Sequence, residues 1–298
     1  MIAAQTAQLL IDAGLDPDRV ERVVRNAVEE DLDGGIDVTT AATVDETARA
    51  VADFTARAPG VAAGIPVAAT ALDVVSGGDA AIEFHVADGE RVEPGTVLFT
   101  VSGRVRDLLT AERTALNLLC HLSGIATLTR RWVDAVEGTG AKIRDTRKTT
   151  PGLRRLEKYA VRCGGGVNHR MSLSDAAMVK DNHVVAAGGA VEAFEAVRKR
   201  CPDLPIEVEV DTLDQLLPVV EAGAELVLLD NFTPERMRAA VLLVGRNEPY
   251  GRTRLEASGG LTLDQARAAA ETGVDYLSVG ALTHSAPILD IGCDFRTD

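Results

Sequence analysis

Residues 206–231 read IEVEVDTLDQLLPVVEAGAELVLLDN, and this stretch decides the fold. Apolar runs at its two ends predict short buried strands, and residues 212–222 between them have the spacing of an amphipathic helix. Asp211, directly before the helix, is a candidate for its N-cap. A strand–helix–strand unit of this kind is typical of a parallel sheet covered by helices.

The same alternation continues on both sides of this unit. We predict further strands in AKIRDT, AAMVKDN, RLEASGG and DYLSVG, and helices over 154–163, 188–200, 233–244 and 262–272. The strict recurrence favours a closed or nearly closed barrel over an open sheet. Only six strands are visible, so an eight-strand barrel is not assured.

The part of the chain before residue 142 has another pattern. Residues 5–30 have helical spacing, and residues 106–136 predict one long helix or two. Between them, VADFTARA, AIEFHVAD and GTVLFTVSG predict strands broken by Gly and Pro. This part is therefore expected to be an α+β arrangement of helices against an antiparallel sheet.

Charge is concentrated in one segment of an acidic chain. The chain has 31 Lys and Arg against 45 Asp and Glu, a net charge of −14, yet residues 142–183 hold ten basic and four acidic residues. An acidic chain repels nucleic acid and anionic membranes, so we expect neither as a partner. The basic segment favours a pocket for a small, multiply anionic ligand. A solvated basic helix face is the alternative for Arg154, Arg155, Lys158 and Arg162.

The cysteines and the chain start bear on location. Cys120, Cys163, Cys201 and Cys293 are too scattered for a metal or redox motif, which fits reduced thiols in a cytoplasmic protein. We identify no signal peptide in residues 1–15 and no apolar run of membrane-spanning length.

Polar side chains cluster where the predicted barrel strands end, which is where barrels of this class carry their active sites. The first two strand ends carry cations and the next two carry carboxylates; the residues are Arg147, Lys148, Lys180, Asp181, Asn182, His183, Glu207, Glu209, Asp211, Asp230 and Asn231. The last two ends are Gly-rich, at Ser258, Gly259 and Gly260 and at Ser278, Val279 and Gly280. Such turns aim backbone N–H groups at a phosphate, although ordinary tight turns would look the same.

Glu209 and Asp230 end neighbouring strands. Two carboxylates there could hold Mg²⁺, stabilise a cationic sugar transition state, or form salt bridges with Lys148 or Lys180. Together the features suit glycosyl transfer from a phosphorylated sugar diphosphate. A barrel aldolase with Lys180 as its Schiff-base amine is the alternative, although the surplus of arginines argues against it. A lipoyl-type carrier domain at residues 88–103 is nearly excluded, because no lysine precedes Lys142.

Several blocks resemble one known family. DTRKTTPGLRRLEKYAVRCGGGVNHRMSLSDAAMVKDNH (145–183) is similar to the signature of the quinolinate phosphoribosyltransferases, also called carboxylating nicotinate-nucleotide pyrophosphorylases. The other matching blocks follow in order along the chain: EDLDGGIDVTT, AERTALNLLCHLSGIAT, EVEVD, LLDNF, EASGG and SVGALTHSAPILDI. The resemblance implies transfer of phosphoribose from phosphoribosyl pyrophosphate to quinolinate, with release of pyrophosphate and CO₂, to give nicotinate mononucleotide for NAD biosynthesis.

The resemblance also implies residue roles. Arg147, His169, Arg170 and Lys180 bind quinolinate, and Lys148 lies near the pyrophosphate and ribose. Glu209 and Asp230 face the ribose and Mg²⁺, with Lys148, Glu209 and Asp230 as the catalytic set. Ser258, Gly259, Gly260 and Gly280 cradle the 5′-phosphate, and Ser278 is a further substrate-binding position.

The architecture that the resemblance implies has two domains. An N-terminal α+β open sandwich, residues 1–115, is followed by an incomplete α/β barrel with fewer than eight strands, residues 116–288. Residues 289–298 return to the first domain. Arg113 reaches the active site of a partner subunit, so the implied enzyme is a homodimer with composite sites.

Overall fold

The computed structural model describes residues 2–245 and 253–296 of the chain. Packing divides the chain into two compact units. Unit 1 comprises Met1–Arg130, Thr149–Gly165 and Leu282–Asp298, and unit 2 comprises Arg131–Lys148 and Gly166–Ala281. Helix α5 (Val105–Ala135) runs unbroken past residue 115, where sequence analysis put the domain boundary, and the two units divide within it.

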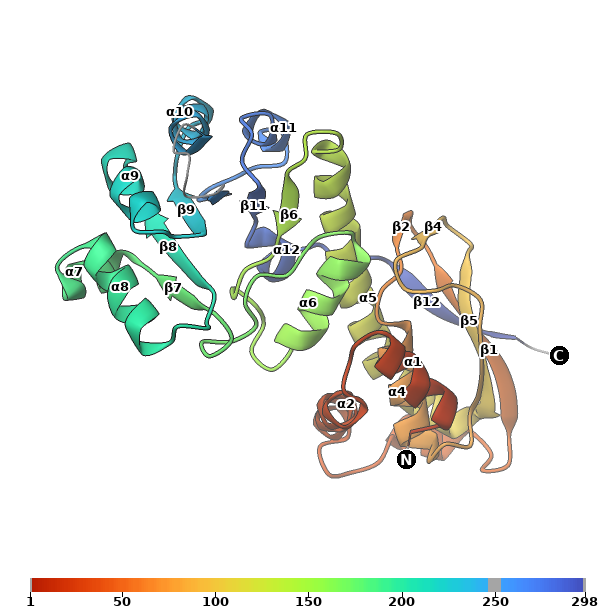
Figure 1. Cartoon of the computed structure of the whole chain (residues 1–298). Coiled ribbons are helices and arrows are strands. Elements are labelled where there is room, and N and C mark those ends of the chain that lie inside the picture. The colour runs from red at the N-terminus through yellow and green to blue at the C-terminus, as the bar shows by residue number, and fades with distance from the viewer. Residues whose placement is uncertain (1, 246–252, 297–298) are drawn as a thin grey trace. The chain divides into compact units, whose positions relative to one another are not determined.

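Unit 1 is built on an antiparallel sheet in the order β12-β1-β5-β3. The strands are β1 (Arg49–Ala56), β3 (Ala81–Phe84), β5 (Val97–Arg104) and β12 (Ile291–Arg296), and a small second sheet joins β2 (Gly60–Val61) to β4 (Arg91–Val92). Its helices, beside α5, are α1 (Ala4–Asp12), α2 (Pro17–Leu32), α3 (Val38–Thr43), α4 (Ile65–Ser76) and α6 (Arg154–Cys163) (Figure 1). The chain after Leu289 thus joins this sheet as its edge strand.

The helical pattern over residues 5–30 forms two helices instead of one. Gly14 has a φ of +71°, a left-handed conformation that ends α1. Asp16 then caps α2, because its side chain accepts hydrogen bonds from the backbone N–H groups of Asp18 and Arg19, and Pro17 occupies the first turn.

Helix α6 corrects one interpretation of the basic segment. Its bounds are those predicted, but it belongs to unit 1 and so is not one of the helices that cover the parallel sheet. A solvated basic face is wrong for Lys158, whose side chain is fully buried, as is that of Glu157. One carboxylate oxygen of Glu157 lies 2.9 Å from Nε2 of His121, and the other accepts a hydrogen bond from the backbone N–H of Thr150.

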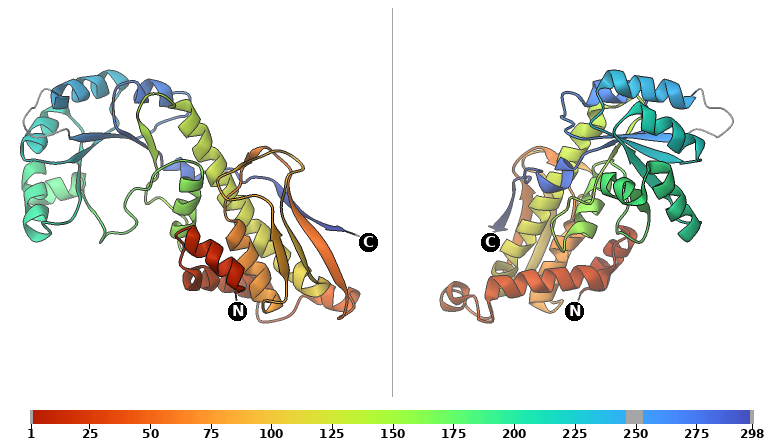
Figure 2. Two further views of the ribbon diagram at one scale, coloured as in Figure 1. Left: turned by 45° about the vertical axis from the view of Figure 1, so that its right-hand side comes forward. Right: turned by 90° about the vertical axis from the view of Figure 1, so that its left-hand side faces the viewer.

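Unit 2 is a six-stranded parallel sheet in the order β6-β11-β10-β9-β8-β7. Its strands are β6 (Lys142–Arg144), β7 (Ala177–Val179), β8 (Ile206–Val210), β9 (Leu226–Asp230), β10 (Arg254–Ser258) and β11 (Tyr276–Ser278). Helices α7 (Asp181–Ala187), α8 (Ala190–Arg200), α9 (Leu213–Glu221), α10 (Pro234–Gly245) and α11 (Ala266–Ala270) form an outer layer, and α12 (Ala281–His284) follows β11 (Figure 2).

The prediction of an incomplete barrel is confirmed, and the expectation of a closed barrel is not. Strands β6 and β7 lie at opposite edges of the sheet order, so the sheet stays open across the described residues. All neighbouring strands are parallel, and Ser258 of β10 stands beside Asp230 of β9. The carboxyl ends of the strands therefore meet along one edge.

Three local details differ from the sequence analysis. Helix α7 follows Lys180 directly and includes Asp181 and Asn182, which the sequence analysis put at the end of a predicted strand; none of its residues is buried. Helix α11 is shorter than the predicted 262–272. Thr212, not Asp211, caps α9, in a capping box with Gln215. No helix in the described ranges has the length and apolar character of a bilayer span.

Candidate active site

A cavity of about 410 Å³ lies at the carboxyl ends of the unit 2 strands. Ten of the candidate residues line it: Arg147, Lys148, His169, Arg170, Lys180, Glu209, Asp230, Ser258, Gly259 and Ser278. Thr146, Met178, Leu228 and Glu256 complete the lining. The parallel sheet thus gathers side chains that are more than 130 residues apart in the sequence, because the strands that carry or precede most of them end along one edge.

The strand period explains which side chains face inward. Side chains two residues apart lie on the same face of a strand. Five residues stand two positions before a cavity-lining residue: Met178, Glu207, Leu228, Glu256 and Tyr276. Each of them lines either this cavity or a second cavity that shares His169 and Arg170 with it. Stepping back by two from the predicted strand ends would have found Glu256, which sequence analysis missed.

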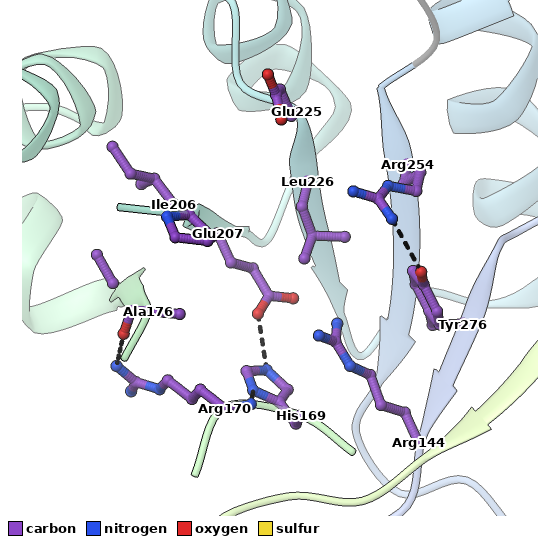
Figure 3. Close-up of a pocket in the computed structure, with 12 residues that line it drawn as sticks. Arg144, His169, Arg170, Ala176, Ile206, Glu207, Glu225, Leu226, Arg254 and Tyr276 are labelled. Atoms are coloured by element: carbon purple, nitrogen blue, oxygen red, sulfur yellow. Dashed lines mark hydrogen bonds and ion pairs between the residues drawn. The ribbon is translucent and has the colours of Figure 1, made fainter. Parts of the chain in front are cut away.

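The cations occupy one side of this cavity. Arg170 is half-buried, and its Nη1 donates to the backbone oxygen of Ala176 at 3.0 Å (Figure 3). Burial and then repulsion from Arg147 lower the pKa of Arg170 from its usual value. Two arginines close enough to repel each other are matched to an anion that binds between them.

Carboxylates occupy the neighbouring strand ends. Nζ of Lys180 lies 2.6 Å from Oε2 of Glu209, which forms one of the salt bridges considered in the sequence analysis. Burial raises the pKa of Asp230, and repulsion from Glu209 and Asp211 raises it further. Such mutual repulsion would be relieved by a cation placed among these carboxylates.

The glycine turn after β10 is shaped for close backbone approach. Gly259 has a φ of +96° and Gly260 a φ of +59°, conformations that favour glycine. A Cβ atom on Gly259 would overlap the side chain of Asn231, whereas one on Gly260 would meet nothing within 4 Å. Only glycine fits at position 259, so the turn and its backbone N–H groups depend on that residue.

Three candidates are placed elsewhere. Gly260 and Gly280 follow Gly259 and Ser278 along the chain, beyond the residues that line the cavity. Arg113 lies on α5 within unit 1, and its side chain is exposed. An exposed arginine in a helix carries no local sequence signal of a binding role, so only the family resemblance singled it out.

The comparisons with known proteins cover nearly the whole chain. Models of the N-terminal and C-terminal domains of quinolinate phosphoribosyl transferase match residues 37–123 and 125–294. The chain belongs to the quinolinate phosphoribosyltransferase family. It is 54% identical over 278 residues to a carboxylating nicotinate-nucleotide pyrophosphorylase of Mycobacterium leprae, covering 93% of this chain and 97% of the relative.

More distant members of the family agree. A decarboxylating quinolinate phosphoribosyltransferase of Nicotiana glauca is 37% identical over 290 residues, covering 93% of this chain and 82% of the relative. The solved nicotinate-nucleotide pyrophosphorylase of Francisella tularensis matches with a TM-score of 0.89 and 36% identity, covering 95% of this chain and 98% of that one. The predicted family, activity and enzyme class are confirmed: the chain is a phosphoribosyltransferase that converts quinolinate to nicotinate mononucleotide.

Proposed function

We propose that the unit 2 cavity holds quinolinate and phosphoribosyl pyrophosphate together, with the residue roles that the family resemblance implies. The observation that carries this proposal is the set of Arg147, Lys148, Arg170 and Lys180 around one cavity of an otherwise acidic chain. Quinolinate is a dicarboxylate, and arginine forks bind carboxylates through two parallel hydrogen bonds. Arg147, His169, Arg170 and Lys180 form the quinolinate end of the cavity.

The sugar end lies at the later strands. Glu209 and Asp230 face the ribose, where their negative charge stabilises the cationic character that C1 acquires as pyrophosphate leaves. Lys148 contacts the pyrophosphate and ribose. The glycine turn at Ser258, Gly259 and Gly260, with Ser278 and Gly280, donates backbone N–H groups to the 5′-phosphate.

The two chemical events need positioning more than acid–base groups. The pyridine nitrogen attacks C1, and the electron pair of the C1–O bond leaves with pyrophosphate. When the C2–carboxylate bond breaks, its electron pair stays on C2 beside the positively charged ring nitrogen, and a proton then completes the product. The cavity contributes orientation and charge complementarity to both events.

Mg²⁺ fits the donor set at Glu209 and Asp230. Carboxylates with substrate phosphates and waters are the ligands that Mg²⁺ prefers. Burial, followed by repulsion from Glu209 and Asp211, raises the pKa of Asp230. An ion bound at Glu209 and Asp230 would neutralise the charge of the diphosphate.

We further propose that the enzyme is a cytoplasmic homodimer in which Arg113 serves the partner's site. Its exposed position on α5 leaves the guanidinium accessible to another subunit. All four cysteines are free thiols, which supports a reducing compartment.

A product assay tests the proposed function. The purified chain is incubated with phosphoribosyl pyrophosphate, Mg²⁺ and either quinolinate or nicotinate, and CO₂ and mononucleotide are followed. We expect equal amounts of both products from quinolinate and no mononucleotide from nicotinate. Equal use of nicotinate, without CO₂ release, would refute the dicarboxylate role of the cation cluster.

The aldolase alternative is disfavoured by the Lys180–Glu209 ion pair, since a Schiff-base amine must be neutral.

A further inference from the structure

Beneath the cavity lies a polar group, largely buried, which we call the acid floor: Arg144, His169, Glu207, Glu256 and Ser278. Its two carboxyl groups, Glu207 and Glu256, have no proposed role. Its members come from β6, β8, β10, β11 and the segment after α6, and each lines the substrate cavity or the smaller cavity of Figure 3, which shows Arg144, His169 and Glu207. Glu207 is 3% exposed and Glu256 is fully buried. Burying two carboxylates is costly, so their presence under a substrate cavity points to a function.

Two arginines, Arg144 within the acid floor and Arg170 beside it, oppose the rise that burial causes in the pKa of Glu207. Arg144 forms an ion pair with Glu256, whose other oxygen accepts a hydrogen bond from Ser278. Burial acts to lower the pKa of Arg144, but the carboxylates of Glu256 and Glu207 outweigh burial and raise it. Arg170 is also coupled to Glu207 electrostatically. Two carboxylates therefore face two guanidinium groups.

A metal ion is the first alternative use of this cluster. Ligand atoms of His169, Glu207 and Glu256 lie within 4.8 Å of one another. However, Nδ1 of His169 accepts the backbone N–H of Arg170 at 2.6 Å, which leaves the ring proton on Nε2. Nε2 then has no lone pair for a metal, and a divalent ion would add charge to a balanced group. The acid floor is therefore not a metal centre.

The remaining contact of His169 identifies the role of Glu207. Nε2 of His169 lies 2.7 Å from Oε2 of Glu207 and 3.8 Å from Oε1 of Glu256 (Figure 3). Among the described residues neither oxygen of Glu207 has a hydrogen-bond partner, so the ring and the carboxylate meet in a short polar contact. The other ring nitrogen accepts a hydrogen bond from the backbone N–H of Arg170. Through this ring, Glu207 is connected to the residue that carries the quinolinate-binding guanidinium.

One side of this ring borders a cavity. This second cavity, of about 130 Å³, is lined by Arg144, His169, Arg170 and Glu207 on the side of the strand starts. On the backbone side, His169 N–H donates to Asp145, which also accepts from the side chain of Asn168. The main chain is thus anchored by Asp145, and the ring is in contact with Glu207.

We propose that Glu207 is a positioning residue for quinolinate: its carboxylate fixes the His169 ring and, through it, the backbone of Arg170. This inference rests on the proposed function, since it assigns His169 and Arg170 to the quinolinate end. It predicts an effect on one substrate only. The sugar end is lined by other residues and does not depend on the orientation of His169.

Three variants test the proposal, with KM for each substrate, kcat and the thermal midpoint measured for each. Glu207→Ala should raise the KM for quinolinate about tenfold or more, since a binding group misplaced by about 1 Å can cost even more. The KM for phosphoribosyl pyrophosphate should stay within about twofold. Glu207→Gln should restore most of the quinolinate affinity, because its amide oxygen keeps the same reach to Nε2 of His169. Glu207→Asp keeps the charge but is too short, and should resemble alanine.

The matched control is Asp73→Asn, which changes a fully buried carboxylate in unit 1 and should leave both KM values unchanged. Equal rises in both KM values, no rise in a folded Glu207→Ala enzyme, or a glutamine variant as poor as alanine would each overturn the positioning role. If the alanine chain does not fold, the contrast between Gln and Asp decides in the same way. Failure of the wild-type chain to use quinolinate would instead refute the proposed function itself.

Discussion

Replacing Arg170 by alanine is the most informative single change, because the structure says how much of its guanidinium is available to a substrate. Nη1 donates to the backbone oxygen of Ala176 at 3.0 Å, and the side chain lines the cavity with its remaining donors. One carboxylate bound by such a fork has two charge-assisted hydrogen bonds, each contributing about 1.5–3 kcal/mol.

Part of that contribution is already offset in the free enzyme. Burial and repulsion from Arg147 lower the pKa of Arg170, whereas the carboxylates of Glu207 and Asp175 already compensate part of its charge before substrate binds. We therefore expect Arg170→Ala to cost about 3–4 kcal/mol of transition-state stabilisation, which lowers kcat/KM for quinolinate roughly 10²–10³-fold. Arg170→Lys keeps the charge but loses the fork, and should lose about half of that free energy.

Steady-state kinetics with each substrate varied in turn gives the answer. The KM for phosphoribosyl pyrophosphate should be largely unaffected by Arg170→Ala, and the exposed Arg238→Ala on α10 should leave both substrates unaffected. An Arg170→Ala enzyme that loses both affinities equally would show that the arginine does not belong to the quinolinate end.

Four further outcomes are expected. Activity should require Mg²⁺ and cease in excess chelator, as measured by product formation; unchanged turnover would remove the metal from the account. Mixing inactive Arg113→Ala with inactive Lys180→Ala chains should restore about a quarter of wild-type sites, because half of randomly exchanged dimers are heterodimers with one intact site; exchange without recovery would place Arg113 in its own subunit. Gly124→Ala should lower the thermal midpoint, although alanine usually favours a helix by about 1 kcal/mol, because a Cβ there would overlap the backbone oxygen of Pro287. Burial raises the pKa of Asp73 above 3.8, so wild-type stability falls as pH rises from 3.8 to that raised pKa; Asp73→Asn should be more stable than wild type at neutral pH, with a gain that shrinks as pH falls through the raised pKa and is lost below pH 3.8 in thermal denaturation.

Much of unit 2 could be predicted because its signals are local. The apolar runs of β8 and β9 and the helical spacing between them determine a strand–helix–strand unit without reference to the rest of the chain. The polar residues that follow each run, such as Lys180 and Asp230, are then brought together by the rule that parallel strands share their carboxyl edge. Sequence alone could not show that the sheet stays open, since closure depends on how the two edge strands meet.

The remaining features depend on tertiary packing that local patterns do not carry. A run of basic residues is typical of a solvated face, so the burial of Lys158 was not predicted, nor that α6 packs in unit 1. Helix α7 has no buried face, so no core-facing pattern in the sequence predicts it. Glu256 was missed because it is a single carboxylate within an apolar strand. It is recognised as a site residue only when one notes that it lies two residues before Ser258, on the same face of the strand.

The central claim is that quinolinate binds with its carboxylates among the cations of the unit 2 cavity. A crystal structure of the chain with quinolinate tests this most directly. We predict that the two carboxylates lie within hydrogen-bond distance of Arg147, Arg170 and Lys180, with the ring nitrogen directed toward Glu209 and Asp230. Quinolinate bound away from these cations, in crystals that retain an active enzyme, would contradict the account.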